Sequence, residues 1–310
     1  MVKDGSVIKN STSVRNRQRT PTEDKILYAV VYIVFILFTI VVLYPIIFVV
    51  SASFSSGHAL NQGKVILWPV NPGLQGYKAV FAYRPVMTGY RNTIFYTLAG
   101  TLINLCVTML CAYPLSRRDF VAKRFFMTMC TITMFFGGGL VPHYLLMVDL
   151  HIINTAWAML LPGAMSVYNM ILVRTNIMST IPNELLEASQ IDGCSDARYF
   201  FSIVLPLSKA VLAVITLYYV VGHWNAYFNA MLYLTNRDLY PLQLVLRDVL
   251  TSSKVDLTEI TDPEILAAMM GLENLLKYAI IVVSALPIII FYPFIQKYFV
   301  KGVMIGSVKG

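Results

Sequence analysis

Six long stretches of the chain contain no Asp, Glu, Lys or Arg, and this feature restricts the fold more than any other. Each has 19 to 27 residues, and they are Ile26–Val50, Asn92–Ser116, Phe125–Val148, Leu150–Val173, Ala210–Asn236 and Tyr278–Gln296. About 20 apolar residues in a helix cross the hydrocarbon core of a bilayer. The sequence therefore predicts an all-α membrane protein with six transmembrane helices.

The composition agrees with this prediction. Hydrophobic residues make up 57% of the chain and charged residues only 13%, whereas a soluble domain carries about 25% charged residues. The net charge of +8 could indicate a polyanion-binding protein, but membrane proteins also accumulate Lys and Arg on their cytoplasmic flanks. A soluble enzyme is disfavoured, and no nucleic-acid partner is expected.

The basic residues predict the orientation of the spans. Sixteen lie in the two tails and in the second-to-third and fourth-to-fifth connections, against eight in the other connections. The positive-inside rule makes the side with sixteen cytoplasmic, so both termini are predicted to be cytoplasmic. The first span is interpreted as a retained helix rather than a signal peptide, because it is long and no clear cleavage site follows.

The predicted organisation has three parts. A polar, basic N-terminal tail covers residues 1–25, with residues 1–20 expected to be disordered, and a short tail covers 297–310. The transmembrane region, 26–296, includes a cytoplasmic loop at 174–209 and extracytoplasmic loops at 51–91 and 237–277. The two outer loops are long enough to be expected to contain structure. The third and fourth spans are separated only by Asp149, which predicts a tight helical hairpin.

The spans lack the residues that chemistry or ion coupling would need. Ion-coupled carriers normally need ionisable groups within the membrane, and His143, His151 and His223 are interpreted as helix contacts. No GxxxxGK[ST] phosphate loop occurs, and the triplet 137–139 is interpreted as a helix break or a close packing site. The four cysteines lack metal-ligand spacing. No catalytic residue and no metal site are therefore predicted, and any uphill work would have to be powered by another subunit.

The segment between the fourth and fifth spans is predicted to form two short helices. Pro182 lies near the start of the first, Glu184 in its first turn and Gly193 at its end. Ser195 can cap the second helix, with Asp196 in its first turn.

The first of these helices has one apolar face, formed at three-residue spacing by Leu185, Ala188 and Ile191. Two such helices form a compact projection that a soluble partner can bind. An interfacial helix lying on lipid is the alternative, but the acidic and short face suits a protein groove better.

This segment resembles the EAA loop of ATP-binding-cassette importer permeases. Glu187-Ala188-Ser189 is followed after three residues by Gly193 and after nine more by Ile203-x-Leu205-Pro206, and the only departure from the family pattern is Ser189. The chain also resembles the shorter permease of the maltose and multiple-sugar systems at Leu74–Phe81 and Gly302–Gly310. Pro142–Asn154 and Gly222–Gln243 are similar to a subgroup associated with complex oligosaccharides.

The resemblance covers roughly residues 25–310 and implies a non-catalytic permease with the type I importer fold in a prokaryotic cell membrane. Its implied partners are a second homologous permease, two ATPase subunits, an extracytoplasmic sugar-binding protein, an oligosaccharide substrate and membrane lipid. This chain would bind no cofactor, because ATP and Mg are used by the ATPase subunits. Residues implied to couple the ATPase to the spans are Glu187, Ala188, Ser189, Asp192, Gly193, Leu205 and Pro206. Gly306 and Lys309 in the C-terminal tail are implied to reach the ATPase interface.

The fifth span is the best candidate for the substrate pathway on physical grounds. If it is one helix, Tyr218, Gly222, Asn225 and Asn229 form a polar stripe about 60° wide. Such a stripe should face protein or a water-filled cavity, because buried amides facing lipid are costly. Helix–helix hydrogen bonding is an equally supported interpretation. Ser166 and Asn169 in the fourth span are weaker pathway candidates.

Two other functions remain open. A permease of the same family for a peptide or an anion is the first, although an anion pore should be lined with Arg or Lys and these spans have none. A membrane-embedded enzyme acting on lipids is the second, and its activity should survive mutation of the EAA-like segment. The sugar, its length and the type of cell envelope do not follow from the sequence.

Overall fold

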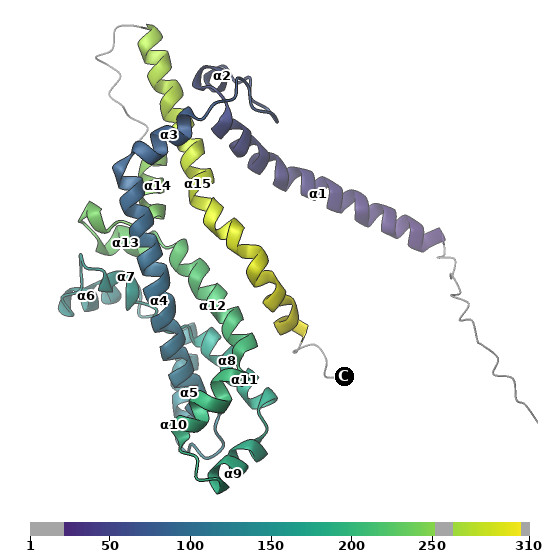
Figure 1. Ribbon diagram of the computed structural model, residues 1–310, viewed down its shortest axis with the longest axis vertical. Coiled ribbons are helices and arrows are strands. Elements are labelled where there is room, and N and C mark those ends of the chain that lie inside the picture. Colours follow the sequence, from purple (N-terminus) through teal and green to yellow (C-terminus); the bar gives the residue numbers. More distant parts are fainter. Residues whose placement is uncertain (1–21, 252–262, 305–310) are drawn as a thin grey trace, which may run out of the picture. The chain divides into compact units, whose positions relative to one another are not determined.

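The structure, a computed structural model, describes residues 22–251 and 263–304, and all regular structure in these residues is helical (Figure 1). The expectations for residues 1–20 and for Gly306 and Lys309 lie outside the described residues. The elements are α1 (Thr22–Phe54), α2 (Gly57–Asn61), α3 (Gln75–Ala82), α4 (Arg84–Ser116), α5 (Lys123–Phe135), α6 (Leu140–Asp149), α7 (Trp157–Leu160), α8 (Val167–Thr180), α9 (Asn183–Ile191), α10 (Asp196–Tyr199), the π-helical η1 (Phe200–Val204), α11 (Leu205–Leu207), α12 (Lys209–Trp224), α13 (Phe228–Tyr233), the 3₁₀-helical η2 (Arg237–Leu239), α14 (Leu242–Thr251) and α15 (Pro263–Met304).

The chain divides into two compact units, residues 1–48 and 49–310. The first contains most of α1, which is apolar around its whole circumference and includes the candidate span Asp24–Phe54. A continuous helix is thus confirmed for the first uncharged stretch.

In the second unit, α4 packs against α8, α12 and α14, and α15 packs against α2, α3, α12 and α14. The buried face of α4 is small and polar, and it includes Asn92, Thr93, Thr97, Gly100, Thr101, Asn104 and Thr108. Its exposed face is large and apolar, and it includes Phe95, Leu98, Leu102 and Leu110. This inverted distribution is typical of a helix in lipid, where small residues let helices approach closely.

The predicted number of six spans is not found. Among the described residues, three helices, α1, α4 and α15, contain a stretch long and apolar enough to cross a membrane, and the count reaches at most five if two bent helix pairs are each one span. The second and sixth uncharged stretches are continuous helix within α4 and α15, whereas the third, fourth and fifth are interrupted.

The third stretch is interrupted by the glycine triplet. Helices α5 and α6 meet there at 115°, and Gly139 has a φ of +85°, a conformation that glycine adopts without steric cost. A Cβ on Gly137 or Gly138 would meet nothing within 4 Å. Of the two interpretations of the triplet, the helix break is confirmed and the close packing site is wrong.

The fourth stretch is not one helix, and the predicted hairpin at Asp149 is wrong. After α6 the chain turns through His151 and Asn154, whose φ angles are +56° and +57°. The Asn154 side-chain oxygen accepts hydrogen bonds from the backbone N–H groups of Thr235 (3.1 Å) and Asn236 (2.8 Å). This distant partner stabilises an irregular loop where the local sequence favoured helix.

The two long connections at 51–91 and 237–277 contain structure, as expected. The first includes α2 and α3, and the second includes η2, α14 and the first residues of α15. Gly57 in α2 packs directly on Gly271 in α15, where a Cβ on Gly57 would lie 2.7 Å from the Gly271 carbonyl carbon. Only glycine permits this approach of two backbones.

Candidate functional site

The first helix of the EAA-like segment forms as its local sequence predicts. Pro182 is the N-cap of α9, Glu184 lies in its first turn, and the helix ends at Ile191. Gly193 has a φ of +68°, and the N–H of Cys194 donates to the carbonyl oxygen of Ser189 at 2.9 Å. The left-handed glycine reverses the chain and satisfies a carbonyl at the end of the helix.

The second helix, α10, continues through a π-turn toward the long helix α12. Ser195 Oγ accepts from the N–H of Arg198 at 3.3 Å and caps α10. The N–H of Leu205 donates to the Phe200 carbonyl oxygen, which defines the π-turn η1. The helical run that contains Leu205 and Pro206 meets α12 at 79°. Pro206 lacks an N–H and favours such a bend, so these two residues join the segment to α12.

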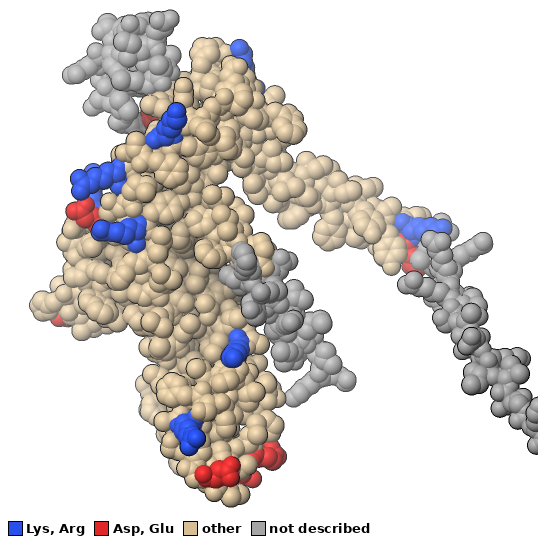
Figure 2. All heavy atoms as spheres, in the orientation of Figure 1, with Lys and Arg blue, Asp and Glu red and all other residues tan. Residues whose placement is uncertain are grey.

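The surface of α9 and α10 is apolar and acidic, and the described chain leaves it uncovered. Leu185 is 40% exposed and Ile191 is 87% exposed. The acidic side chains Glu184, Glu187 and Asp192 are also exposed, whereas the Asp196 carboxylate of α10 accepts a hydrogen bond from Arg117 and is not counted with this surface. Figure 2 shows acidic side chains gathered at the end of the molecule that α9 forms. This surface has the composition of a protein docking site.

Ser189, the one departure from the EAA pattern, lies on the opposite face. It is 7% exposed, and its hydroxyl donates to the Leu186 carbonyl oxygen at 2.7 Å. A buried hydroxyl costs little when its hydrogen bond is made. The substitution of Ala by Ser is therefore compatible with the fold of α9.

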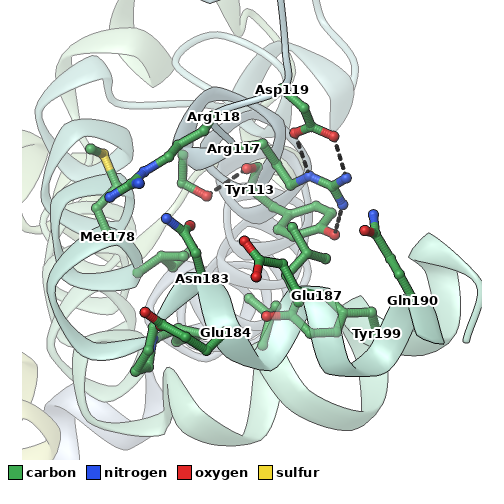
Figure 3. A pocket seen from close by; sticks show the side chains of 16 residues that line it. Tyr113, Arg117, Arg118, Asp119, Met178, Asn183, Glu184, Glu187, Gln190 and Tyr199 are labelled. Atoms are coloured by element: carbon green, nitrogen blue, oxygen red, sulfur yellow. Dashed lines mark hydrogen bonds and ion pairs between the residues drawn. The ribbon is translucent and has the colours of Figure 1, made fainter. Parts of the chain in front are cut away.

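Behind α9 lies a cavity of about 560 Å³ (Figure 3). Its lining comes from α9, from the end of α8 and from the α4–α5 connection, and it includes Glu187, Asn183, Arg118 and Arg117. Arg117 bonds Asp119 and Tyr113 there (Figure 3). The ion pair with Arg117 holds the pKa of the Asp119 carboxyl below its usual value, and hydrogen bonding to Asp119 raises the pKa of Arg117.

In the sequence, Arg117 and Arg118 indicate only the orientation of the spans, and the contacts of Arg117 were not predicted. Arg117 also donates to Asp196, which is 79 positions away in the sequence. Neither residue belongs to a motif of fixed spacing, so only tertiary structure brings them together.

Polar contacts join α4 to α12 and to the connection between α7 and α8. His223 Nε2 lies 2.6 Å from Asn104 Oδ1, and Asn104 Nδ2 donates to the Gly163 carbonyl oxygen at 2.9 Å. The hydroxyls of Thr108 and Tyr219 lie 2.7 Å apart. The interpretation of His223 as a helix contact is confirmed.

His143 also makes a contact between helices. Its Nδ1 lies 2.7 Å from the Tyr233 hydroxyl. His151, by contrast, lies in the turn after α6 rather than on a helix, so the interpretation as a helix contact is wrong for His151.

The polar stripe proposed for the pathway is shorter than predicted. Tyr218, Gly222 and Asn225 lie along one exposed face of α12 and its C-cap. The helix ends at Trp224, and Asn229 lies on the separate helix α13. The continuous four-residue stripe is thus wrong. The Asn225 side chain donates back to the Val221 carbonyl oxygen at 2.9 Å, which accompanies this helix end.

Ser166 and Asn169 have structural surroundings. The Ser166 hydroxyl caps α8 by accepting from the N–H of Asn169 at 3.4 Å, and the Ser166 N–H donates to the Tyr219 hydroxyl at 3.2 Å. Asn169 is 4% exposed. Ser166 thus contacts Tyr219 of α12, Asn169 is buried, and neither residue lies on the open face of α12.

The fold and this segment define a membrane permease of a binding-protein-dependent importer. Residues 14–305 match the family "Binding-protein-dependent transport system inner membrane component", and the chain belongs to this family. It has the type I permease fold.

Particular relatives agree with this assignment. The chain is 38% identical over 266 residues to protein LplC of Bacillus subtilis (strain 168), covering 86% of this chain and 89% of LplC. It is 36% identical over 283 residues to the polygalacturonan/rhamnogalacturonan transport system permease protein YtcP of the same organism, covering 90% and 97%. A chain from the crystal structure of a bacterial transporter that imports the acidic polysaccharide alginate superimposes with a TM-score of 0.83 at 34% identity, covering 91% of this chain and 99% of that one.

Proposed function

We propose that this chain is the permease subunit of an ATP-driven importer of oligosaccharides. It would act with a second homologous permease, two ATPase subunits and an extracytoplasmic binding protein. ATP and Mg would be used by the ATPase subunits, and this chain would have no catalytic site. The observation that carries the proposal is the EAA-like segment, which presents an uncovered apolar and acidic surface and runs through a π-turn into α12.

The proposed mechanism begins at this surface. The ATPase subunit would bind the exposed face around Ile191, and a basic group of that subunit would pair with Glu187. Closure of the ATPase pair on ATP would displace α9 and α10. Because η1 and α11 connect directly to α12, the displacement would reach the face that carries Tyr218, Gly222 and Asn225. Alternating access follows if this face lines the pathway.

The proposed orientation places the EAA-like segment and both termini in the cytoplasm of a prokaryotic cell. The binding protein would then dock at the other side of the membrane, near the α3–α4 turn. A hollow of about 430 Å³ there is lined by Arg84, Arg237, Asp238 and Asp248. Exposed charges of both signs suit reversible docking of a soluble protein, because they favour fast and specific encounter.

The names of similar proteins support a choice among candidate sugar substrates. The name of one relative gives polygalacturonan and rhamnogalacturonan as its substrates, and a solved homologue belongs to an alginate importer. Oligosaccharides of acidic polysaccharides are therefore the first substrates to test, and their carboxylates would be bound by residues outside the six uncharged stretches, because those stretches contain no Arg or Lys. The open α12 face offers an aromatic ring and an amide, groups that stack on sugar rings and bond to hydroxyls.

The test is uptake by the reconstituted complex. The chain, its permease and ATPase partners and the binding protein would be placed in proteoliposomes with labelled oligogalacturonides, alginate oligosaccharides or maltooligosaccharides. We expect ATP-dependent and binding-protein-dependent uptake of at least one of the acidic probes. Absence of ATP-dependent uptake of all three would contradict the proposal, and uptake of maltooligosaccharides alone would contradict its substrate class.

A further inference from the structure

We propose that Arg117 is a positioning residue for coupling, which ties the EAA-like segment to the end of α4 so that both move as one body. The proposal rests on the function proposed above and adds a further route from the ATPase to the membrane helices. The direct chain connections lead to α8 at one end of the segment and to α12 at the other. The Arg117 contact leads to α4, which packs against α8, α12 and α14.

The Arg117 guanidinium bridges three groups from two parts of the chain. Its Nη1 donates to Asp196 Oδ1 at 2.6 Å and to the Tyr113 hydroxyl at 2.9 Å. Its Nε and Nη2 donate to the two carboxylate oxygens of Asp119 at 2.8 Å and 2.5 Å. Tyr113 belongs to α4, Asp119 to the α4–α5 connection and Asp196 to the first turn of α10.

The environment makes this contact more than a surface ion pair. The Arg117 side chain is only 12% exposed, although its carboxylate partners are 59% and 71% exposed. A bidentate pair fixes the plane of the guanidinium, so Asp119 orients Arg117 toward Asp196. A lysine has no planar fork and cannot satisfy two carboxylates and a hydroxyl in this geometry.

The last turn of α4 is also hydrogen-bonded to α8. Arg174 of α8 donates through Nε to the Leu115 carbonyl oxygen at 2.8 Å. The end of α4 is therefore bonded to two elements, to α8 through Arg174 and to α10 through Arg117. Displacement of α10 transmitted through Arg117 would act on a helix end that is already fixed to the neighbouring helix.

The test compares Asp196→Asn and Arg117→Gln with the matched control Arg124→Gln, using the complete transporter complex. Arg124 is an exposed cation in the first turn of α5. The native cysteines are replaced by Ala, and spin labels are attached at Arg198→Cys on α10 and Leu102→Cys on α4. In the labelled protein with Arg117 and Asp196 intact, and in Arg124→Gln, the distance between the labels should stay constant on trapping with ATP and vanadate. In Asp196→Asn and Arg117→Gln, called the network variants below, this distance should change by about 2 Å or more, the scale of helix shifts in coupled transitions.

A second readout is uptake of oligogalacturonide per ATP hydrolysed. The network variants should hydrolyse ATP with their ATPase subunits retained, but transport about tenfold less sugar per ATP, a typical size for coupling between sites. Arg117→Lys, which keeps the charge, should give an intermediate ratio.

Two results would overturn the proposal. The first is a label distance that changes on ATP trapping in the intact network, or that stays constant in the network variants. The second is lower thermal stability or loss of the ATPase subunits with an unchanged transport ratio. If no form of the complex imports sugar, the proposed function fails, whereas the label distances still decide the role of Arg117.

Discussion

His223 of α12 contacts Asn104 of α4, and the His223 ring lies beside Gly100, the residue one helical turn before Asn104. Nε2 of His223 lies 2.6 Å from Asn104 Oδ1, and a Cβ on Gly100 would lie 2.4 Å from the same ring. The imidazole therefore occupies the space that a larger residue at position 100 would fill. The contact of α4 with α12 depends on this glycine and on the hydrogen bond beside it.

Gly100→Ala should destabilise the permease by about 1–3 kcal/mol, the usual cost of overpacking a well-packed core. The added methyl must displace the ring of His223 and disturb its hydrogen bond to Asn104. Gly137→Ala is the matched control, because a Cβ there would meet nothing within 4 Å. Thermal unfolding of the purified complex measures both variants, and equal melting temperatures would contradict the assignment of this contact.

Asn225→Ala should lower uptake several-fold without lowering the melting temperature. The side chain is exposed, and its Nδ2 donates to the carbonyl oxygen of Val221, one turn earlier in α12. Loss of a hydrogen bond to a sugar corresponds to about 0.5–1.5 kcal/mol. Asn229→Ala shows whether the pathway extends beyond the end of α12. A lower melting temperature with unchanged uptake per complex would remove Asn225 from the proposed pathway.

The proposed orientation is tested by impermeant thiol labelling in a background without the native cysteines. Lys64→Cys should react from outside intact cells, and Val121→Cys should react only after the cells are opened. Both positions are exposed, Val121 to 97%, so accessibility does not limit the reaction. The reverse pattern would contradict the orientation based on basic residues.

The local structure of the EAA-like segment could be predicted because its signals are local. Pro182 and Ser195 mark the helix starts, and Gly193 supplies the left-handed residue that ends α9. These effects act within one or two turns of a helix. The resemblance to a family could be found for the same reason, since its motif has fixed spacing.

The glycine triplet indicated the break in the third uncharged stretch, but the breaks in the fourth and fifth could not be predicted from composition. A stretch without charges satisfies the length requirement for a span, but it does not exclude turns whose polar groups have partners elsewhere. The loop at Asn154 is stabilised by backbone groups at Thr235 and Asn236. The contact between Arg117 and Asp196 likewise joins distant positions, so it follows only from the fold.

The central claim is that α9 is the docking element for the ATPase subunit. Its most direct test is the amount of ATPase subunit that copurifies with the Glu187→Lys permease in detergent, compared with wild type. Glu187 is exposed at the rim of the cavity beside α9, so reversing its charge should leave the fold intact and repel a basic group of the partner. Asp149→Lys, an exposed reversal at the end of α6, serves as the matched control.

We expect Glu187→Lys to retain several-fold less ATPase subunit than wild type and to lose ATP-dependent uptake, while Asp149→Lys retains the wild-type amount. Removing one partner of a hydrogen-bonded charge pair at an interface costs about 2–5 kcal/mol, which is enough to produce this loss. Full retention of the ATPase subunit with normal uptake in Glu187→Lys would contradict the account.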